Sequence, residues 1–283
     1  MKYSYYPGCT AKTTSVEFGF STEAVCEALG VELVELEDWS CCGASSAHSL
    51  NHELSLALPA RNVALAQDTH LDLVTSCPAC YQNSLKADRA LREDEAWRRK
   101  MEETLDFRYN GEGEPRHLLD VLSHDLSLDE IRARVVKPLK GLKVAAYYGC
   151  VLVRPPEFTG WDDAEHPMTM DRLLEAVGAE AVDWSYKVDC CGASLTLSRG
   201  EIVTKLSSRI VNGAIEAGAD CIATACGICQ INLDTRQKCE REVPIFYFTE
   251  LMGIALGVSG LEKMWGKHGV DPRPLLRERG FLA

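Results

Sequence analysis

The pattern of apolar and polar residues predicts short strands that alternate with helices, in an order that occurs twice along the chain. Each predicted strand is a brief apolar run beside a turn, and the predicted helices repeat apolar residues every three or four positions. We expect strands over residues 2–6, 31–36, 71–75 and 115–119, and again over residues 143–148, 221–224 and 243–248. Such alternation indicates two α/β units, each with a mainly parallel sheet.

Sequence signals also mark where some of the helices begin or break. Thr14 with Glu17, and Ser127 with Glu130, have the spacing of a capping box, in which two side chains satisfy free N–H groups at a helix start. Pro59 lacks the N–H that a helix interior needs, so we expect a break or kink in the helix around it.

We interpret the two series as an internal duplication, because strands, helices and cysteines recur in the same order. The expected fold class is α/β, with two tandem domains related by a pseudo-two-fold axis. The first domain is predicted over residues 1–138, with a charged helical insertion over about 86–114, and the second over 139–283. Lys137 and Pro138 mark the predicted boundary.

Charge and composition narrow the class of protein. The chain has 283 residues and a net charge of −12, which argues against nucleic acid or an anionic membrane surface as the main partner. No run reaches the ~18 apolar residues of a transmembrane segment, and no secretory signal pattern opens the sequence. We therefore expect a cytoplasmic protein, in which clustered cysteines indicate metal more often than disulfides.

Ten of the 13 cysteines fall into two sets of five with matching spacing. Each set has one upstream cysteine, an adjacent pair inside the repeated pentapeptide Cys-Cys-Gly-Ala-Ser at 41–45 and 190–194, and a downstream C-x-x-C. In both halves 34 residues separate the pair from the C-x-x-C, whereas the upstream arms differ, with 31 and 39 residues. The sets are Cys9, Cys41, Cys42, Cys77 and Cys80, and Cys150, Cys190, Cys191, Cys226 and Cys229.

Five clustered cysteines are compatible with several kinds of site. Neighbouring Cα atoms lie about 3.8 Å apart, which is too close for a comfortable disulfide between adjacent cysteines. Structural zinc takes four ligands, so five thiolates are one too many, although zinc in one half stays open. Iron–sulfur clusters are favoured, either as a cube with a spare cysteine or as a cluster of unusual connectivity. Each C-x-x-C is expected at a helix start, where N–H groups favour negative charge.

The whole arrangement resembles the paired cysteine-rich CCG domains of the heterodisulfide reductase B subunit. The segments 6–10, 77–80, 148–150 and 244–257 also match that family, and the resemblance spans essentially the whole chain. Related CCG proteins include type E succinate dehydrogenase and fumarate reductase subunits, the iron–sulfur subunits of lactate and glycolate oxidases, and heterodisulfide-reductase-like proteins of sulfur oxidisers.

The resemblance implies two noncubane [4Fe–4S] clusters, one bound by each set of five cysteines. It implies a catalytic subunit that cleaves a small disulfide between the two clusters, or forms it in reverse. Electrons would come from the ferredoxin-like iron–sulfur C subunit, itself supplied by the flavoprotein A subunit. The alternative is an electron-transfer subunit of a quinone-linked complex, similar to type E succinate dehydrogenase or fumarate reductase, without disulfide chemistry.

Other reactive side chains have less specific interpretations. His48 and His52 follow the first cysteine pair and are candidates to deliver a proton to a thiolate, with a solvated or capping role as the alternative. Arg154, Lys187 and Arg199 are candidates to attract an anionic substrate, with salt bridges as the alternative.

The three remaining cysteines are not expected to bind metal. Cys26 on a helix and Cys221 in a strand are expected to pack as small apolar residues, and Cys239 is expected to be exposed.

Overall fold

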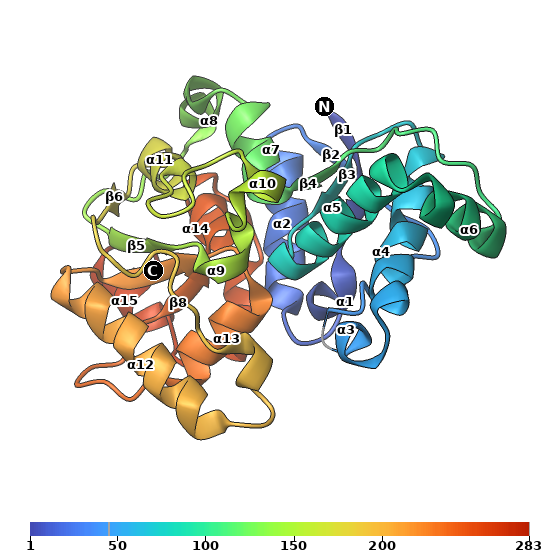
Figure 1. Cartoon of the computed structure of the whole chain (residues 1–283). Helices are drawn as coiled ribbons and strands as arrows, with labels where there is room; N and C mark the ends of the chain where they lie inside the picture. Colours follow the sequence, from blue (N-terminus) through green and yellow to red (C-terminus); the bar gives the residue numbers. More distant parts are fainter. Residues whose placement is uncertain (45, 283) are drawn as a thin grey trace.

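The chain forms two halves, each built on a four-stranded parallel sheet (Figure 1). The computed structural model describes residues 1–44 and 46–282. Ser45, the last residue of the first repeated pentapeptide, and Ala283, the last residue of the second predicted domain, lie outside the described residues.

The first sheet has the order β2-β1-β3-β4, and the second has the equivalent order β6-β5-β7-β8. All the strand pairs in both sheets are parallel. The predicted α/β class and the duplication are therefore confirmed. The strands are β1 (Lys2–Tyr6), β2 (Glu32–Glu35), β3 (Leu73–Thr75), β4 (Pro115–His117), β5 (Lys143–Tyr147), β6 (Glu180–Ala181), β7 (Cys221–Thr224) and β8 (Ile245–Tyr247).

Helices follow nearly every strand and cover the two sheets. Those of the first half are α1 (Gly8–Ala11), α2 (Val16–Ala28), α3 (Ala47–Leu50), α4 (His52–Gln67), α5 (Pro78–Glu93), α6 (Glu95–Leu105), α7 (Leu118–His124) and α8 (Leu128–Arg134). Those of the second half are α9 (Gly149–Leu152), α10 (Pro156–Thr159), α11 (Thr169–Ala176), α12 (Gly200–Glu216), α13 (Gly227–Arg236), α14 (Phe248–Ala255) and α15 (Arg273–Glu278), with 3₁₀ turns η1 (Ala193–Leu195), η2 (Leu261–Lys263) and η3 (Trp265–Lys267).

The two halves pack through a reciprocal pair of helix contacts. Helix α2 of the first half packs on α14 of the second, and α11 of the second half packs on α7 of the first. Since α2 and α11 are equivalent, as are α7 and α14, these contacts have the pattern of a two-fold interface. Phe18 on α2 stacks on Tyr247 with ring centroids 4.2 Å apart. One apolar core therefore includes residues of both halves.

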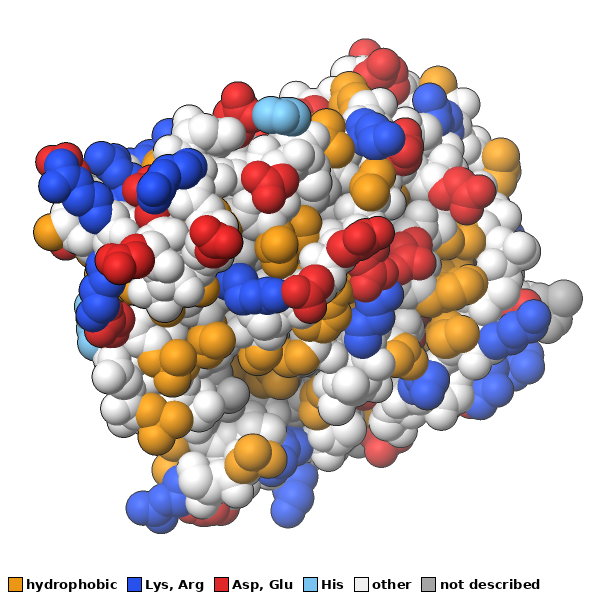
Figure 2. Space-filling model, turned by 90° about the vertical axis from the view of Figure 1, so that its right-hand side faces the viewer, with side chains coloured by type: hydrophobic (Ala, Val, Ile, Leu, Met, Phe, Trp, Pro, Cys, Tyr) orange, Lys and Arg blue, Asp and Glu red, His pale blue; other side chains and the backbone are white. Residues whose placement is uncertain are grey.

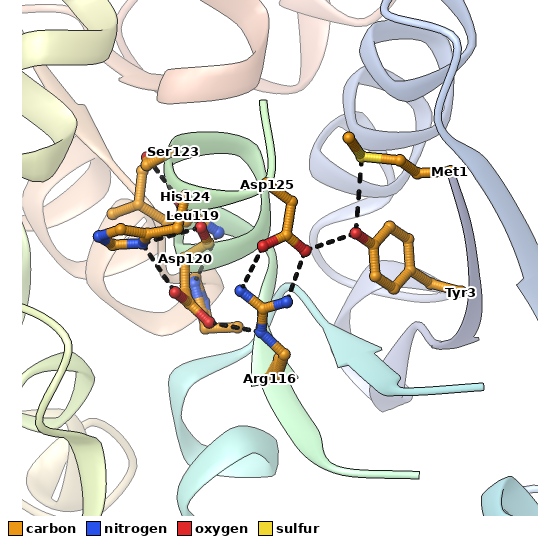
Figure 3. A network of polar contacts seen from close by, with 9 residues as sticks. Met1, Tyr3, Arg116, Leu119, Asp120, Ser123, His124 and Asp125 are labelled. Atoms are coloured by element: carbon orange, nitrogen blue, oxygen red, sulfur yellow. Dashed lines mark hydrogen bonds and ion pairs between the residues drawn. The ribbon is translucent and has the colours of Figure 1, made fainter. Parts of the chain in front are cut away.

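A polar network joins both ends of α7 to the first sheet (Figure 3). Arg116 on β4 donates two hydrogen bonds to the carboxylate of Asp125, at 2.5 and 3.0 Å, and one to Asp120 at 2.8 Å. The hydroxyl of Tyr3 on β1 donates to Asp125 at 2.5 Å, and His124 contacts Asp120 at 2.8 Å. Because α7 packs on α11, this network also orients one of the two interhelix contacts.

Of three local predictions, one is confirmed and two differ from the structure. The capping box at Ser127 and Glu130 is confirmed, but the one at Thr14 is wrong because Ser15 is the residue that precedes α2. Pro59 lies inside α4 and does not end it. The break comes earlier, at Asn51, whose side chain accepts a hydrogen bond from the N–H of Leu54 at 3.2 Å.

The predicted charged helical insertion contains parts of two helices. It takes in the second part of α5 and all of α6, which meet at Asp94. The Asp94 carboxylate accepts a hydrogen bond from the N–H of Trp97 at 2.9 Å and so starts α6. Figure 2 shows acidic and basic side chains interspersed over this outer face of the first half. The domain boundary at Lys137 and Pro138 stays a prediction.

Within residues 1–44 and 46–282, no helix is both long enough and apolar enough to cross a membrane.

Candidate metal centre

The first set of five cysteines is assembled at the carboxyl ends of β1 and β3. Cys9 lies on α1, directly after β1, while Cys77 precedes α5 and Cys80 lies in its first turn. The thiol of Cys80 contacts those of Cys42 and Cys77, and the thiol of Cys9 contacts that of Cys41. Residues up to 71 positions apart in sequence thus meet because parallel strands end at the same edge of the sheet.

The second set is assembled in the same way. Cys150 lies on α9 after β5, and Cys226 precedes α13 after β7. The sulfur atoms of Cys191 and Cys229 are 3.5 Å apart, and the thiol of Cys150 contacts that of Cys190. Both sets therefore consist of the residues that the sequence singled out.

Two glycines let the turn after each first strand approach the C-x-x-C closely. Gly8 has φ +71°, and a Cβ atom placed on it would lie 3.1 Å from Sγ of Cys80. Gly149 has φ +72°, and its Cβ would lie 3.1 Å from Sγ of Cys229. Both the backbone conformation and the space beside the sulfur therefore require glycine at these positions.

The thiols within each set differ in pKa. A hydrogen bond from Cys80, with help from the amide of Asn83, lowers the pKa of Cys42 to about 7 in spite of burial. In the second half, the hydrogen bond from Cys150 and the backbone N–H of Gly192, 3.3 Å from the sulfur, lower the pKa of Cys190 to about 6. One thiol in each contact is thus favoured as the thiolate that metal binding requires.

The sequence interpretation missed two residues that support the cysteines in both halves. Asn83 and Asn232 each lie three positions after a C-x-x-C. The amide of Asn83 donates to the carbonyl of Cys42 at 3.1 Å, and that of Asn232 donates to the sulfur of Cys191 at 3.5 Å. Their identical position in the two repeats is the signal that could have identified them.

A tyrosine at the end of each first strand holds the segment that leads into the adjacent cysteines. The hydroxyl of Tyr6 donates to the carbonyl of Ser40 at 2.8 Å, and that of Tyr147 donates to the carbonyl of Asp189 at 2.6 Å. These two carbonyl groups immediately precede Cys41 and Cys190. Both tyrosines are fully buried, so the two segments are anchored to the sheets.

Each cysteine set also touches the opposite half of the molecule. Helix α5, which carries Cys80, packs on α9 and α10, and the amide of Gln82 donates to the carbonyl of Val151 at 3.1 Å. In the reciprocal contact, a Cβ atom placed on Gly227 would lie 2.6 Å from Oγ of Ser15 and 3.5 Å from Oγ1 of Thr10. The segment around each C-x-x-C therefore contacts the opposite half of the molecule.

The three candidate cations near the second set have other partners. Lys187 is buried, and its ammonium group lies 2.8 Å from the carboxylate of Asp171. Arg154 pairs with Glu165 at 2.6 Å, and Arg199 lies 3.6 Å from Glu201. The salt-bridge interpretation thus describes all three side chains.

His48 and His52 line a cavity of about 310 Å³ beside the first cysteine pair. The structure places neither histidine in hydrogen-bond contact with a cysteine among the described residues, so proton delivery to a thiolate stays a prediction.

The leftover cysteines behave largely as expected. Cys26 and Cys221 are buried, and burial raises the pKa of both thiols. The prediction that Cys239 is exposed was wrong, because it is partly buried and its thiol donates to the carbonyl of Ser208 at 3.6 Å. Each cysteine in the described part of the chain is a free thiol. Across that part, no three His, Cys, Asp or Glu side chains are arranged to hold a single metal ion, and metal ligation by the two sets stays a prediction.

Comparison with known proteins gives matches over nearly the whole chain. The model of the cysteine-rich domain family CCG matches twice, over residues 3–83 and 144–234. An 8-methylmenaquinol:fumarate reductase membrane anchor subunit of Wolinella succinogenes is 32% identical, over 97% of this chain and 99% of its own. The B subunit of a ferredoxin/F420H2-dependent CoB-CoM heterodisulfide reductase of Methanosarcina acetivorans is 31% identical, over 91% of this chain and 90% of its own.

A solved structure supports the fold. A hypothetical protein from Helicobacter pylori has a TM-score of 0.73 and 14% sequence identity, and the match covers 94% of this chain but 51% of that one. At this identity the likeness concerns the fold alone. Both relatives are named as subunits of reductase complexes. The chain belongs to the family of paired cysteine-rich CCG-domain proteins that includes the heterodisulfide reductase B subunit.

Proposed function

We propose that this chain is the catalytic iron–sulfur subunit of a heterodisulfide-reductase-type complex, which cleaves a small disulfide reductively or forms it in reverse. The observation that supports the proposal is that the C-x-x-C segments of two equivalent five-cysteine sets each contact the opposite half, with α5 packed on α9 and Gly227 beside Ser15 and Thr10. The reaction converts one disulfide, two electrons and two protons into two thiols. An external donor must supply the electrons, and the proposed source is a ferredoxin-like C subunit that receives them from a flavoprotein A subunit.

The residues present fit iron–sulfur clusters in both halves. Each set offers five thiols, the ligands that such clusters prefer, and the close approach at Gly8 and Gly149 leaves room for sulfur rather than for a side chain. When bound, such a cluster supplies electron transfer in single steps. We propose that Cys9, Cys41, Cys42, Cys77 and Cys80 hold one noncubane [4Fe–4S] cluster and that Cys150, Cys190, Cys191, Cys226 and Cys229 hold the other.

The protein's own contribution would be to bind and orient the substrate. On this proposal the two sets face each other across the interface, so that each half could receive one sulfur of the disulfide. Reducing a disulfide requires two electrons, and two one-electron centres would each deliver one. On this proposal the gene duplication gives the chain two centres for one two-electron bond.

A second candidate function is electron transfer in a quinone-linked complex, without disulfide chemistry. It is favoured by the Wolinella succinogenes relative, which is a membrane anchor subunit of a fumarate reductase and matches over 99% of its length. In that case the two halves need not contribute equally.

Turnover of the anaerobically purified complex separates the two candidates. We expect reduced-viologen-dependent reduction of a disulfide in the native complex, and a loss of at least a hundredfold in Cys42→Ala and in Cys191→Ala. Cys239→Ala is the matched control, because this cysteine lies outside both sets, and it should retain native activity. Native activity in either set variant would contradict the proposal. Reduction of a menaquinone analogue without disulfide turnover would favour the second candidate.

A further inference from the structure

Helix α12 lies at the outer edge of the second half (Figure 1). A groove of about 520 Å³ runs beside it. Its lining includes Lys205, Arg209 and Asn212 of the helix, Lys238 of the turn after α13, and Tyr186. The groove is therefore a polar surface feature that three separate segments of the chain build together.

The walls of the groove are held in place by contacts with α12. The guanidinium of Arg209 lies over the ring of Tyr186, 5.3 Å from its centroid. A Cβ atom placed on Gly213 would lie 2.2 Å from this ring, so the ring packs directly on the helix backbone. On the other side, the N–H of Lys238 donates to Oγ of Ser208 at 2.9 Å. The groove is thus formed before any partner binds.

The groove is positively charged in a chain whose net charge is −12. Its lining carries three lysine and arginine side chains and one acid, Glu216. Arg209 lies 3.7 Å from Asp189. Within residues 1–44 and 46–282, Lys205 and Lys238 form no ion pair with an acidic side chain. The charge of the groove is therefore complementary to an acidic partner.

The equivalent face of the first half is covered by a helix. A constant shift of 149 positions relates the adjacent cysteines and the C-x-x-C of the two halves, so that α4 corresponds to α12. Helix α6 packs on α4 and α5, and its Met101 is buried in one apolar cluster with Ala60 and Val63 of α4. The same shift places Arg209 and Asn212, which line the groove, at the positions of Ala60 and Val63. A helix-binding face of the first half thus corresponds to the charged groove of the second.

The second half has a shorter link at the point where the first half has α6. Residues 94–114 connect α5 to β4 and include α6, whereas residues 237–244 connect α13 to β8. Within the described ranges 1–44 and 46–282, this shorter link contains no helix. A helix that covered α12 in the same way would therefore come from another molecule.

Apolar side chains are exposed at the end of α12 where the helix starts. Leu197 is fully exposed and Ile202 is 37% exposed, and the 3₁₀ turn η1 packs on α12 just before them. Ile202, Lys205 and Arg209 follow one another at helical spacing, so they lie on one face of α12. Exposed apolar side chains beside a charged groove are typical of a protein interaction surface.

A second copy of this chain does not offer a complementary surface. The acidic surface of the chain that is hollowed is itself a groove, beside α2 and β2, with a volume of about 540 Å³. Four glutamates line it, namely Glu23, Glu27, Glu32 and Glu35. The last two are already paired with lysine side chains. Two concave surfaces do not fit into each other, so the charges of the two grooves cannot meet.

We propose that the groove on α12 is the docking site for an amphipathic helix of another protein. Acidic side chains of that helix pair with Lys205 and Lys238, and its apolar side chains cover Leu197 and Ile202. This is the helix-in-groove mode of recognition, in which an apolar stripe gives affinity and charges fix the register.

The docked helix lies close to the second cysteine set. Arg209 contacts Asp189, which directly precedes Cys190. The carbonyl of Asp189 also accepts the hydrogen bond from the hydroxyl of Tyr147. That the partner is a subunit of the same complex rests on the proposed function, whereas the docking of an acidic helix does not.

Photo-cross-linking in the complete complex tests which segment occupies the groove. Asn212, an uncharged residue of the lining, is replaced by the photoreactive p-benzoylphenylalanine, and cross-linked peptides are identified by mass spectrometry. We expect a cross-link to a helical segment of another subunit in which Asp and Glu outnumber Lys and Arg. The same replacement at Lys140, an exposed residue outside the groove, should give no cross-link to that segment.

Charge reversal tests the ionic part of the docking. In the double variant Lys205→Glu, Lys238→Glu, association of the full chain with the remaining subunits should weaken about tenfold or more, because like charges then face each other. The double variant Lys137→Glu, Lys140→Glu makes the same change in net charge at two exposed lysines outside the groove, and it should associate as the native chain does. Biolayer interferometry under argon gives the affinities, and circular dichroism checks that both variants fold.

The outcomes distinguish the inference from the proposed function, because neither readout needs turnover. A cross-link to a second copy of this chain, to a segment without an excess of acidic residues, or to no segment would overturn the inference. Equal affinities of the two double variants would overturn it as well. A complex that docks in the stated way but reduces no disulfide contradicts the proposed function alone, and one that reduces disulfides without this docking contradicts the inference alone.

Discussion

The two halves of this molecule share a scaffold and differ in what surrounds their cysteines. Both have the same strand order, the same close glycine, and the same asparagine beside the cysteine pair. The first half adds α6 and a cavity lined by His48, His52 and Lys86, whereas the second half has a buried tryptophan, Trp184, where the first has the half-buried Trp39. Features shared by both halves therefore indicate what positions the cysteines, and features of one half indicate where the surroundings of the two sets differ.

The halves also differ in the charged groups that fix the helix after each fourth strand. In the first half Arg116 pairs with Asp120 and Asp125 in a partly exposed network. In the second half the equivalent of Asp120 is Glu250, which is buried and lies 3.1 Å from His268. A solvent-accessible network of two acids and an arginine thus corresponds to a buried acid–histidine pair.

The largest expected effect on stability comes from the contact that joins the halves. Phe18→Ala removes a buried ring that stacks on Tyr247 and contacts Phe248, so we expect a loss of about 3–5 kcal/mol in the free energy of unfolding. Leu50→Ala is the control, because that side chain is 76% exposed and its removal should change stability by less than about 0.5 kcal/mol. Urea unfolding followed by circular dichroism gives both values. A loss below about 1 kcal/mol in Phe18→Ala would mean that the halves are stable independently.

Substitution of the glycines that approach each C-x-x-C tests whether both cysteine sets need this close approach in order to bind iron. Gly8→Ala and Gly149→Ala each add strain of about 1–2 kcal/mol at a positive φ, and each places a methyl group 3.1 Å from a cysteine sulfur. We expect both variants to lose iron from one centre.

Gly141→Ala provides the matched control for these variants. It has φ +79°, with no atom within 4 Å of the added Cβ, so it should cost only the backbone strain. Iron content and thermal unfolding distinguish the effects. Full iron content in Gly8→Ala would show that the close approach is not needed for ligation.

The charged networks of the two halves are expected to contribute to folding stability with opposite dependence on pH. Burial opposes ionisation of Asp125, but hydrogen bonds from Arg116 and Tyr3 hold its pKa below the ordinary value. Its contribution to stability is therefore present above the ordinary pKa of an aspartate and is lost as pH falls through the lowered value. Burial also opposes the charge on His268, but Glu250 raises its pKa to about 9. Its contribution is complete below pH 6.5 and is lost as pH rises through about 9.

Two conservative variants separate these contributions. Asp125→Asn should lower the melting temperature most near neutral pH and have little effect at the acid end, because the native carboxylate is protonated there. His268→Gln should destabilise by about 1–3 kcal/mol near pH 6, and by less at pH 10. Thermal unfolding between pH 2 and pH 10 provides the check, and a destabilisation of His268→Gln that is independent of pH would show that the histidine packs without charge.

Much of the fold could be predicted from the sequence because the sequence pattern occurs twice. The strands, the duplication and the gathering of both cysteine sets follow from local apolar patterns and from letter-for-letter repetition. The helix start at Ser15 could not be predicted, because Thr14 and Ser15 are both good capping residues and only the backbone decides between them.

The packing of elements that lie far apart in the sequence could not be predicted either. Helix α2 packs on α14, and α11 packs on α7. These contacts depend on the complementary shapes of apolar faces, which no local sequence pattern encodes. Cys239 was predicted to be exposed from its charged neighbours, but the turn after α13 folds it against Ser208 of α12. The cavity beside the first cysteine pair required the structure as well, because His48, His52 and Lys86 come from three different helices.

The most direct test of the two-centre account is the iron, sulfide and zinc content of the anaerobically purified chain and of two variants. We predict about eight irons and about eight labile sulfides per native chain, and about half of each in both Cys42→Ala and Cys191→Ala. Zinc without labile sulfide, or iron that is lost in only one of the two variants, would contradict the account.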